Sequence, residues 1–496
     1  MAVIALAFLG VTTRLLSLEE MAVFAVYNTF CGFLTVVCSL GLLSSCIKRL
    51  PGLLASGRLA EAADLGRLSA GVYVGGAAAV TLLLLLAATP ISRLLLKTAQ
   101  LGPQVRWAAA AALCYGLYEA SQLMLSAAQR FGAVSAYNVT AALAQRVLSL
   151  LLLFPFGIEG YLAGFALGSL LGAGLGLRTL APQLRLRDAE PGSRPRARDH
   201  VAYAVPFYAD GYLRYFSMHA DQLLVGIFLE PASLAIYFVA KRFLQYCQVL
   251  VSSLVDPLGT KVAELAVTDG QAVRRAFSTS LTYFLLLFVP LSVALACSSP
   301  FLLWAIGGER YMAGVIPLAL LFLSLPFYAV YSHLWTFAYV LGRPAERLRC
   351  NLVATVSQAA GMVALMPSLG LAGLAASRSL GFGVAAFYAG RRLDQPLRAG
   401  SGQAVRRAAA AGVSSAVAVA ATILVPHLLV GKPVLIPLYY LPAGGATLLC
   451  LLVCLAPEDR LGLARMVPGR GRASTVARAV LAGTGGPLER ADASDR

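Results

Sequence analysis

The chain carries NVTAALAQRVLSLLLLFPFGIEGYLAGFALGSLLGAGLGLRTL at residues 138–180 and repeats it, altered, 213 positions later as NLVATVSQAAGMVALMPSLGLAGLAASRSLGFGVAAFYAGRRL at residues 351–393. The two stretches are identical at 12 of 43 ungapped positions, where a chain so rich in leucine and alanine would give about 4 by chance. In the first copy the shared residues are Asn138, Ala141, Gln145, Leu152, Gly157, Gly160, Ala163, Leu167, Gly168, Ala173, Arg178 and Leu180. Both copies are almost entirely apolar, so the pattern predicts a duplicated bundle of membrane helices.

The composition places the chain in the membrane. Hydrophobic residues make up 59% of the 496 residues and charged residues 13%, whereas soluble domains carry about 25% charge. A spanning helix needs about 20 apolar residues, and the apolar runs here are too long for the strands of a barrel. The sequence therefore predicts an all-α, polytopic membrane protein with about fourteen spans, near residues 1–16, 23–46, 68–89, 107–129, 134–156, 158–180, 201–229, 234–256, 278–306, 313–341, 348–367, 369–390, 408–430 and 434–456.

The basic residues that give the net charge of +17 lie mostly on one side of the predicted membrane spans rather than in one patch of the sequence. Twenty-nine lysines and arginines fall on every second connection or in the C-terminal tail, and six fall on the opposite side. Such an asymmetry places the basic connections in the cytoplasm. We therefore expect a multi-pass protein of the cytoplasmic (inner) membrane with both termini in the cytoplasm, in contact with anionic membrane lipids and not with nucleic acid.

The repeat and the polar segments give the domain organisation. An even number of spans separates the copies, so the two six-helix bundles are parallel repeats. The predicted parts are an N-terminal lobe (1–180), a cytoplasmic linker (181–200), a C-terminal lobe (201–393), two additional transmembrane helices (405–456) and a basic, disordered cytoplasmic tail (457–496).

No pattern in the sequence points to catalysis, a cofactor or a metal. The Gly-Lys pair at 431–432 lacks the upstream glycine of a phosphate-binding loop. The four histidines are scattered, and the nine cysteines lie in or beside spans without a CxxC pair. We therefore expect no enzyme, no cofactor and no metal site.

The informative residues are the charges inside spans, because a charge in lipid is costly and usually faces a cavity or a partner. The cations outnumber the acids, which favours an anionic substrate, and arginine suits phosphate oxygens. With polar neighbours on spans 2 and 8, the predicted substrate-binding residues are Arg146, Arg214, Lys241, Arg242, Arg378, Gln245, Gln248 and Asn28. The predicted ion-coupling or ion-pair residues are Asp210, Asp221 and Glu119, since a desolvated carboxylate takes up a proton more readily.

Helical periodicity groups several of these residues. Asp210, Arg214 and Asp221 fall on one face of span 7, within about 40° of one another. Polar stripes run along span 8 (Tyr237, Lys241, Gln245, Gln248, Ser252) and, 213 positions earlier, along span 2 (Phe24, Asn28, Gly32, Thr35, Ser39). The faces agree with a common central cavity. The alternatives are an internal Asp210–Arg214 ion pair and stripes that only form hydrogen bonds between helices.

Four segments carry a resemblance to a known family: RLLSLEEMAVFAVY at 14–27, HADQLLVGIFLEPASLAIYFVAKR at 219–242, GERYMAG at 308–314 and GLAGLAAS at 370–377. They resemble segments of polysaccharide transporters, the O-antigen flippase family of the MATE-like MOP flippase superfamily. Alanines at 22 and 235 stand where that family has glycine, and the arginine-rich first span of lipid II flippases is missing.

This resemblance implies a flippase that moves a polyprenyl-pyrophosphate-linked oligosaccharide to the outer leaflet by alternating access, for surface polysaccharide synthesis. Its partners would be the lipid-linked oligosaccharide, membrane lipids, a glycan polymerase and glycosyltransferases. Two alternatives stay open: a cation-coupled multidrug exporter of the MATE type, and a membrane-embedded polysaccharide polymerase or ligase. The excess of cations within spans argues against the first, and the short outer connections argue against the second.

Overall fold

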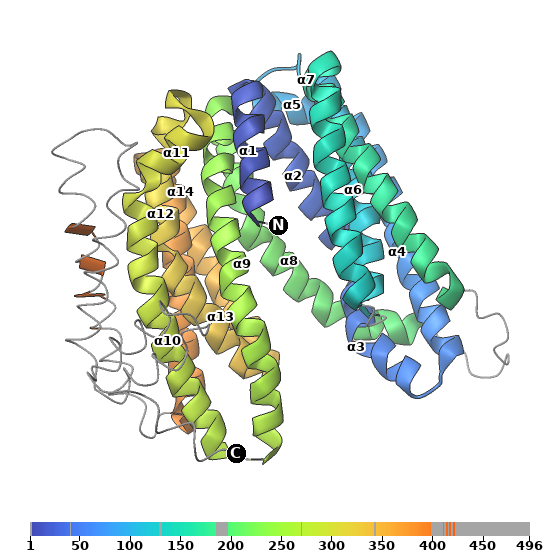
Figure 1. Cartoon of the computed structure of the whole chain (residues 1–496), viewed down its shortest axis with the longest axis vertical. Coiled ribbons are helices and arrows are strands. Elements are labelled where there is room, and N and C mark those ends of the chain that lie inside the picture. Colours follow the sequence, from blue (N-terminus) through green and yellow to red (C-terminus); the bar gives the residue numbers. More distant parts are fainter. Residues whose placement is uncertain are drawn as a thin grey trace, which may run out of the picture. The chain divides into compact units, whose positions relative to one another are not determined.

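The computed structural model contains only helices over the residues that it describes, which are 2–39, 41–127, 131–184, 197–268, 270–341, 344–397 and a few positions between 410 and 421 (Figure 1). The predicted all-α fold is therefore confirmed. The elements are α1 (Ala2–Leu15), α2 (Leu18–Ser39), α3 (Leu42–Ala55), α4 (Leu59–Leu86), α5 (Ala88–Leu96), α6 (Gly102–Ala127), α7 (Phe131–Leu184), α8 (Ala197–Phe228), α9 (Pro231–Thr268), α10 (Gly270–Cys297), α11 (Ser299–Gly307), the 3₁₀ helix η1 (Glu309–Gly314), α12 (Val315–Leu323), α13 (Leu325–Val340) and α14 (Pro344–Leu397).

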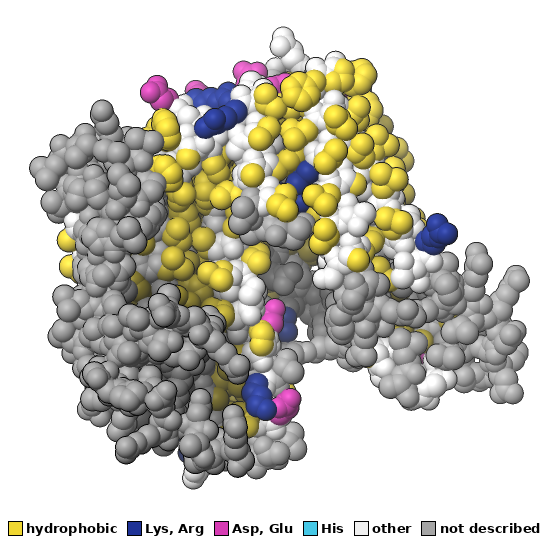
Figure 2. Space-filling model, in the orientation of Figure 1, with side chains coloured by type: hydrophobic (Ala, Val, Ile, Leu, Met, Phe, Trp, Pro, Cys, Tyr) yellow, Lys and Arg dark blue, Asp and Glu magenta, His cyan; other side chains and the backbone are white. Residues whose placement is uncertain are grey.

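Several of these helices suit a bilayer. Seven described segments are long and apolar enough to cross a membrane, and Ile4–Leu15 is a shorter apolar helix. Large apolar side chains point outward, with Leu83, Phe154 and Val363 exposed by 63%, 75% and 76%. Hydrophobic side chains cover much of the described surface in Figure 2. Such a surface requires a lipid environment, as expected of a multi-pass membrane protein.

The structure divides three of the predicted spans, those at 23–46, 278–306 and 313–341, the last at Ser324 between α12 and α13. The span at 23–46 is two helices, because α2 ends at Ser39 and Gly41 has a φ of +75°. Only glycine adopts that conformation at little cost. The span at 278–306 is likewise divided at Ser298, between α10 and α11. Apart from a few helical positions between 410 and 421, the two helices predicted at 405–456 lie outside the described residues, as do the tail at 457–496 and most of the linker at 181–200.

The chain forms two compact units. The first comprises Met1–Arg242 with Ile306–Arg310 and Met362–Leu374, and the second comprises Phe243–Ala305, Tyr311–Gly361 and the described residues from Ala375 onward. In the first unit α2 packs against α4, α6 and α8. Its core holds the rings of Phe8, Phe24, Tyr27, Tyr161, Phe165 and Phe238. In the second unit α10 packs against α12 and α13 around Phe277 and Phe337.

The duplication is visible in the backbone of α7 and α14. Each is two helices joined at a glycine with a positive φ, Gly157 at +60° and Gly370 at +56°. A Cβ at Gly160 would lie 2.0 Å from the carbonyl oxygen of Leu152, and a Cβ at Gly373 would lie 2.3 Å from that of Leu365. No other residue could occupy these two positions without moving the helices apart, so the shared glycines set the same close turn in both copies.

A hydrogen bond is repeated with the turn. The Tyr118 hydroxyl donates to Asn138 Oδ1 at 3.1 Å, and the Tyr331 hydroxyl donates to Asn351 Oδ1. Tyrosine and asparagine are separated by 20 residues in both copies, and the copies are again offset by 213. Asn138 and Asn351 therefore have the same hydrogen-bond partner in their two copies, in agreement with the predicted equivalence.

Candidate functional site

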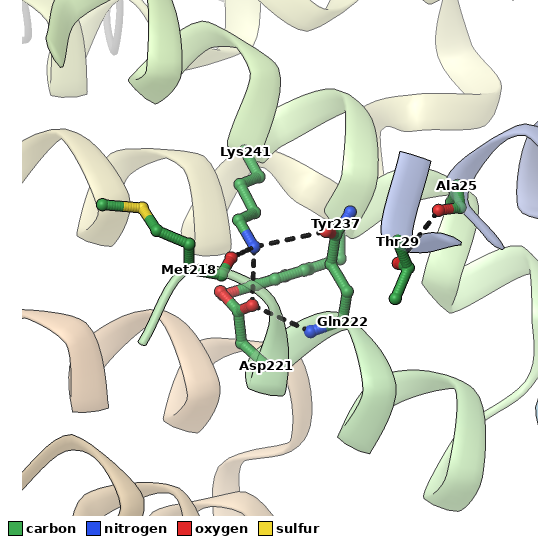
Figure 3. Close-up of polar contacts among 7 residues, drawn as sticks. All are labelled: Ala25, Thr29, Met218, Asp221, Gln222, Tyr237 and Lys241. Atoms are coloured by element: carbon green, nitrogen blue, oxygen red, sulfur yellow. Dashed lines mark hydrogen bonds and ion pairs between the residues drawn. The ribbon is translucent and has the colours of Figure 1, made fainter. Parts of the chain in front are cut away.

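Asp221 on α8 and Lys241 on α9 form a buried ion pair (Figure 3). Lys241 Nζ lies 2.6 Å from Asp221 Oδ1, and the two side chains are 1% and 0% exposed. Asp221 also accepts hydrogen bonds from the Tyr237 hydroxyl and from the backbone N–H of Gln222, both at 2.9 Å. The Lys241 ammonium donates further to the Met218 carbonyl oxygen and, at 3.3 Å, to Gln222 Oε1.

This network is closed. A lysine ammonium has three donors, and Lys241 directs them to Asp221, Met218 and Gln222. Desolvating two charges is costly, and the cost is recovered only with good geometry and satisfied hydrogen bonds. Both conditions hold here. In this conformation Lys241 and Asp221 therefore neutralise one another out of reach of a bound molecule.

A second centre lies on α2, α6 and the start of α9. Thr35 donates its hydroxyl hydrogen to Glu119 Oε2 at 2.5 Å. Arg242 donates to Asn28 Oδ1, and its guanidinium carbon lies 4.9 Å from the centre of the Phe238 ring. Glu119, Arg242 and Asn28 are only partly buried. Unlike the Asp221–Lys241 pair, these groups keep some access to their surroundings.

The charges of this second centre act on the same neighbours. Glu119 and Arg242 both interact electrostatically with Cys31 and Tyr115. Glu119 and Arg146 both interact with Tyr118. Arg146, on α7, is also partly buried; it donates to the Ala142 carbonyl oxygen at 3.1 Å. We call Glu119, Arg146 and Arg242 the half-buried charge cluster.

The structure thus brings together, within the first unit, six of the eleven residues predicted for the site: Asn28, Glu119, Arg146, Asp221, Lys241 and Arg242. Arg378, Gln245 and Gln248 belong to the second unit. Arg378 is 1% exposed, with its guanidinium carbon 5.8 Å from the Phe382 ring centre. The side chains of Asp210 and Arg214 lie outside the described residues, so their contact, and the idea that Asp221 positions Arg214, stay predictions.

The direct contact between Asp221 and Lys241 was not predicted from the sequence. A signal was present, because both residues lie about ten positions from the turn that joins α8 to α9. Opposite charges at similar depth on consecutive antiparallel helices can meet. Tyr115 lies four positions before Glu119 on one helix, so periodicity indicates that the two are neighbours, whereas nothing in the sequence indicated Cys31. Among the described residues, no group of three or more His, Cys, Asp or Glu side chains is arranged to hold a metal ion.

Comparisons with known proteins agree with this architecture. A family model described as "Polysaccharide biosynthesis protein" matches residues 11–316. The fold is similar to that of the lipid II flippase MurJ in an inward closed conformation, with a TM-score of 0.67 and 13% identity over 91% of this chain and 98% of that chain. It is also similar to an inward-facing multidrug resistance MATE family transporter of the MOP superfamily (TM-score 0.68, 16% identity, 79% of this chain and 94% of that chain).

A third similar structure is a MOP superfamily transporter from Pyrococcus furiosus, with a TM-score of 0.55 and 13% identity over 80% of this chain and 96% of that chain. At such identities the likeness concerns the fold alone. No curated protein matches the sequence.

Proposed function

The chain belongs to the polysaccharide biosynthesis protein family and has the fold of MOP superfamily transporters, and we propose that it flips a polyprenyl-pyrophosphate-linked oligosaccharide across the cytoplasmic membrane. The product would serve O-antigen, capsule or exopolysaccharide synthesis. The two repeats would alternate access to the two sides, with the sugar and pyrophosphate between the helices and the lipid tail in the bilayer.

The half-buried charge cluster is the observation that carries this proposal. Arg146 and Arg242 are partly buried arginines on helices of a membrane bundle. Arginine binds phosphate oxygens through two parallel hydrogen bonds and is more weakly hydrated than lysine, so it can leave water more readily. A pyrophosphate could take the place of Asn28 as an acceptor for Arg242.

Lys241 has a different role in this proposal. Its ammonium is already neutralised by Asp221 and buried. Lys241 would therefore hold α9 on α8 in this conformation, and it would contact the head group only after the pair separates. Further contacts from the same C-terminal repeat would come from Arg214, Arg378, Gln245 and Gln248.

Glu119 is proposed as the coupling group. Its carboxylate accepts a hydrogen bond from Thr35 and interacts electrostatically with Cys31, as Arg242 does. Uptake and release of a cation there would alter the net charge that the head group meets. The same feature would suit a cation-coupled small-molecule exporter, which is the second candidate and is favoured by the acidic part of the cluster.

The test is complementation of a flippase-deficient strain, with surface polysaccharide and accumulated lipid-linked oligosaccharide both measured. We expect the wild-type chain to restore surface glycan, and Arg146→Gln/Arg242→Gln to accumulate the intermediate at normal protein levels. Arg93→Gln, which removes an exposed cation of α5, is the matched control. Full activity of the double variant would overturn the head-group assignment, and drug resistance without glycan export would favour the second candidate.

The proposed orientation has both termini in the cytoplasm. Glycosyltransferases on that side would make the substrate, and a polymerase on the outer side would receive the flipped product. Single cysteines at positions 97 and 432 are expected to react with an impermeant reagent from outside. Cysteines at 187 and 398 are expected to stay unlabelled in intact cells. Labelling of a cysteine at 187 or 398 from outside would contradict the proposed orientation.

A further inference from the structure

Two cations, Lys97 and Arg310, stand 213 positions apart, which is the offset of the repeat. Lys97 follows the nine-residue helix α5, and Arg310 follows the nine-residue helix α11. The head-group proposal uses neither of them. Both lie in the first compact unit, and both reach the end of a helix that belongs to the other repeat.

Arg310 binds the C-terminal end of α1. Its guanidinium donates to the carbonyl oxygen of Leu16 at 3.1 Å and to that of Thr13. The Thr13 hydroxyl donates in turn to the carbonyl oxygen of Ile306 at 2.8 Å. The Thr13 carbonyl has no donor from the next helical turn, because the backbone N–H of Ser17 is bound to the Glu20 carboxylate at 2.8 Å. Arg310 supplies the missing donor.

Lys97 does the same for α8. Its ammonium donates to the carbonyl oxygen of Ile227 and, at 3.0 Å, to that of Leu94. The residue four positions after Ile227 is Pro231, which has no N–H to donate. Beside this contact, a Cβ at Gly226 would lie 3.4 Å from the Cβ of Leu95. The α8 backbone therefore lies directly against the end of α5.

The two contacts correspond through the repeat. Thr13 and Gly226 are 213 positions apart, and each lies against the end of the short helix of the other repeat. A cation at a helix C-terminus binds carbonyl groups that the helix leaves unsatisfied and interacts favourably with the helix dipole. Because each repeat supplies the cation for the other, the contacts hold the two repeats together at one membrane face. By the charge asymmetry of the connections, this is the face away from the cytoplasm.

We propose that Lys97 and Arg310 are a repeat-related pair of latches that close the outer side, and that both must release before the outward-open conformation forms. This inference rests on the alternating access of the proposed function. The Lys97 contact is exposed, the Arg310 contacts are partly buried, and both cations are exposed residues, so each latch is weak and reversible. A strong latch would trap the transporter, whereas two weak ones can open together when the substrate is bound.

The first test is a cross-link across the Lys97 latch. Leu95→Cys/Gly226→Cys in a chain without other cysteines places two Cβ atoms at a separation suited to a disulfide. We expect oxidation to stop glycan export and a reductant to restore it. The control is Thr89→Cys/Gly102→Cys, whose Cβ atoms lie 3.9 Å apart within one repeat. The control is expected to transport in both states. Export by the oxidised Leu95→Cys/Gly226→Cys protein would overturn the proposal.

The second test needs no substrate, so it separates this inference from the proposed function. With Cys31, which is 6% exposed, as the only cysteine, its labelling by an impermeant maleimide from outside reports opening. Lys97→Gln or Arg310→Gln is expected to raise the labelling rate about threefold, and the double variant about tenfold, since separate weak contacts add. Arg93→Gln is the control. Unchanged labelling in the double variant would refute the latches even if the protein exports glycan. Raised labelling in a protein that exports none would leave the latches standing and refute the glycan substrate.

Discussion

The first unit contains two charged centres that use similar residues in opposite ways. At the Asp221–Lys241 pair the charges are 0% and 1% exposed, and the hydrogen bonds around them form a closed set. At the half-buried charge cluster the side chains are partly exposed; the Glu119 carboxylate accepts a hydrogen bond from Thr35, and the Arg242 guanidinium donates one to Asn28. A buried, closed pair fixes helices, whereas a partly exposed charge can exchange a neutral hydrogen-bond partner for a ligand.

The difference has an energetic basis. Breaking a buried pair leaves a lone charge in a low dielectric, so the pair cannot open at each transport cycle without a compensating partner. A neutral amide or hydroxyl is a weaker competitor than a phosphate for a guanidinium. We therefore assign stability to the Asp221–Lys241 pair and substrate handling to the cluster, and the variants below test that division.

The largest effect is expected at Lys241. Lys241→Ala would strand the Asp221 carboxylate in the interior, at a cost of about 3–5 kcal/mol in folding free energy. Detergent-solubilised protein should show a lower melting temperature and a smaller monodisperse peak in size-exclusion chromatography. Lys241→Met/Asp221→Leu removes both charges and is expected to recover most of the yield. A single variant as stable as the wild type would show that the pair is not structural.

The next effect is expected at Arg242, in transport rather than in stability. A hydrogen bond to a charged group is worth about 1.5–3 kcal/mol, so Arg242→Gln should slow flipping roughly 10- to 100-fold. Arg242→Lys keeps the charge but loses the paired hydrogen-bond geometry, so its flipping rate should lie between those of the wild type and Arg242→Gln. Flipping is measured in proteoliposomes against the amount of folded protein. Equal loss of stability and transport would show that Arg242 stabilises the fold rather than handling the substrate.

Much of the fold could be predicted because its signals are local. The glycines at 157, 160, 370 and 373 stand at fixed offsets, and their backbone requirement makes them recognisable in sequence. The break at Gly41 was missed because the apolar run continues across it, and hydrophobicity does not report φ.

The site was only partly predictable for a geometrical reason. Periodicity assigns Asp221 and Lys241 to faces of their helices, but it does not give the rotation of one helix against its neighbour. Thr35 and Glu119 are 84 positions apart, so no pattern along the chain links them. The charges could therefore be named, whereas their partners required the packing of α2, α6, α8 and α9.

A smaller effect is expected at Glu119. Glu119→Gln keeps the hydrogen bond to Thr35 in one amide orientation but removes the charge. A coupling free energy is typically about 1–3 kcal/mol, so if Glu119 couples an ion to flipping, an imposed ion gradient should accelerate flipping by the wild type at least about fivefold. Glu119→Gln should lose most of this acceleration. Transport is compared with and without a proton or sodium gradient. Retained dependence on the gradient would place coupling elsewhere, with Asp210 the next candidate.

The smallest effects come from a matched pair of hydroxyl deletions, one at each centre. Tyr237→Phe removes a hydrogen bond to the Asp221 carboxylate, and Thr35→Val removes one to the Glu119 carboxylate. Each bond is worth about 1.5–3 kcal/mol at most, because one partner is charged, and water can replace part of it only at the half-buried cluster. Tyr237→Phe should therefore lower the melting temperature and leave flipping per folded molecule unchanged. Thr35→Val should leave the melting temperature nearly unchanged and slow gradient-driven flipping a few-fold. If the two variants exchange these phenotypes, the division between a structural pair and a working cluster is wrong, because each variant removes one hydroxyl donor to the carboxylate of its own centre.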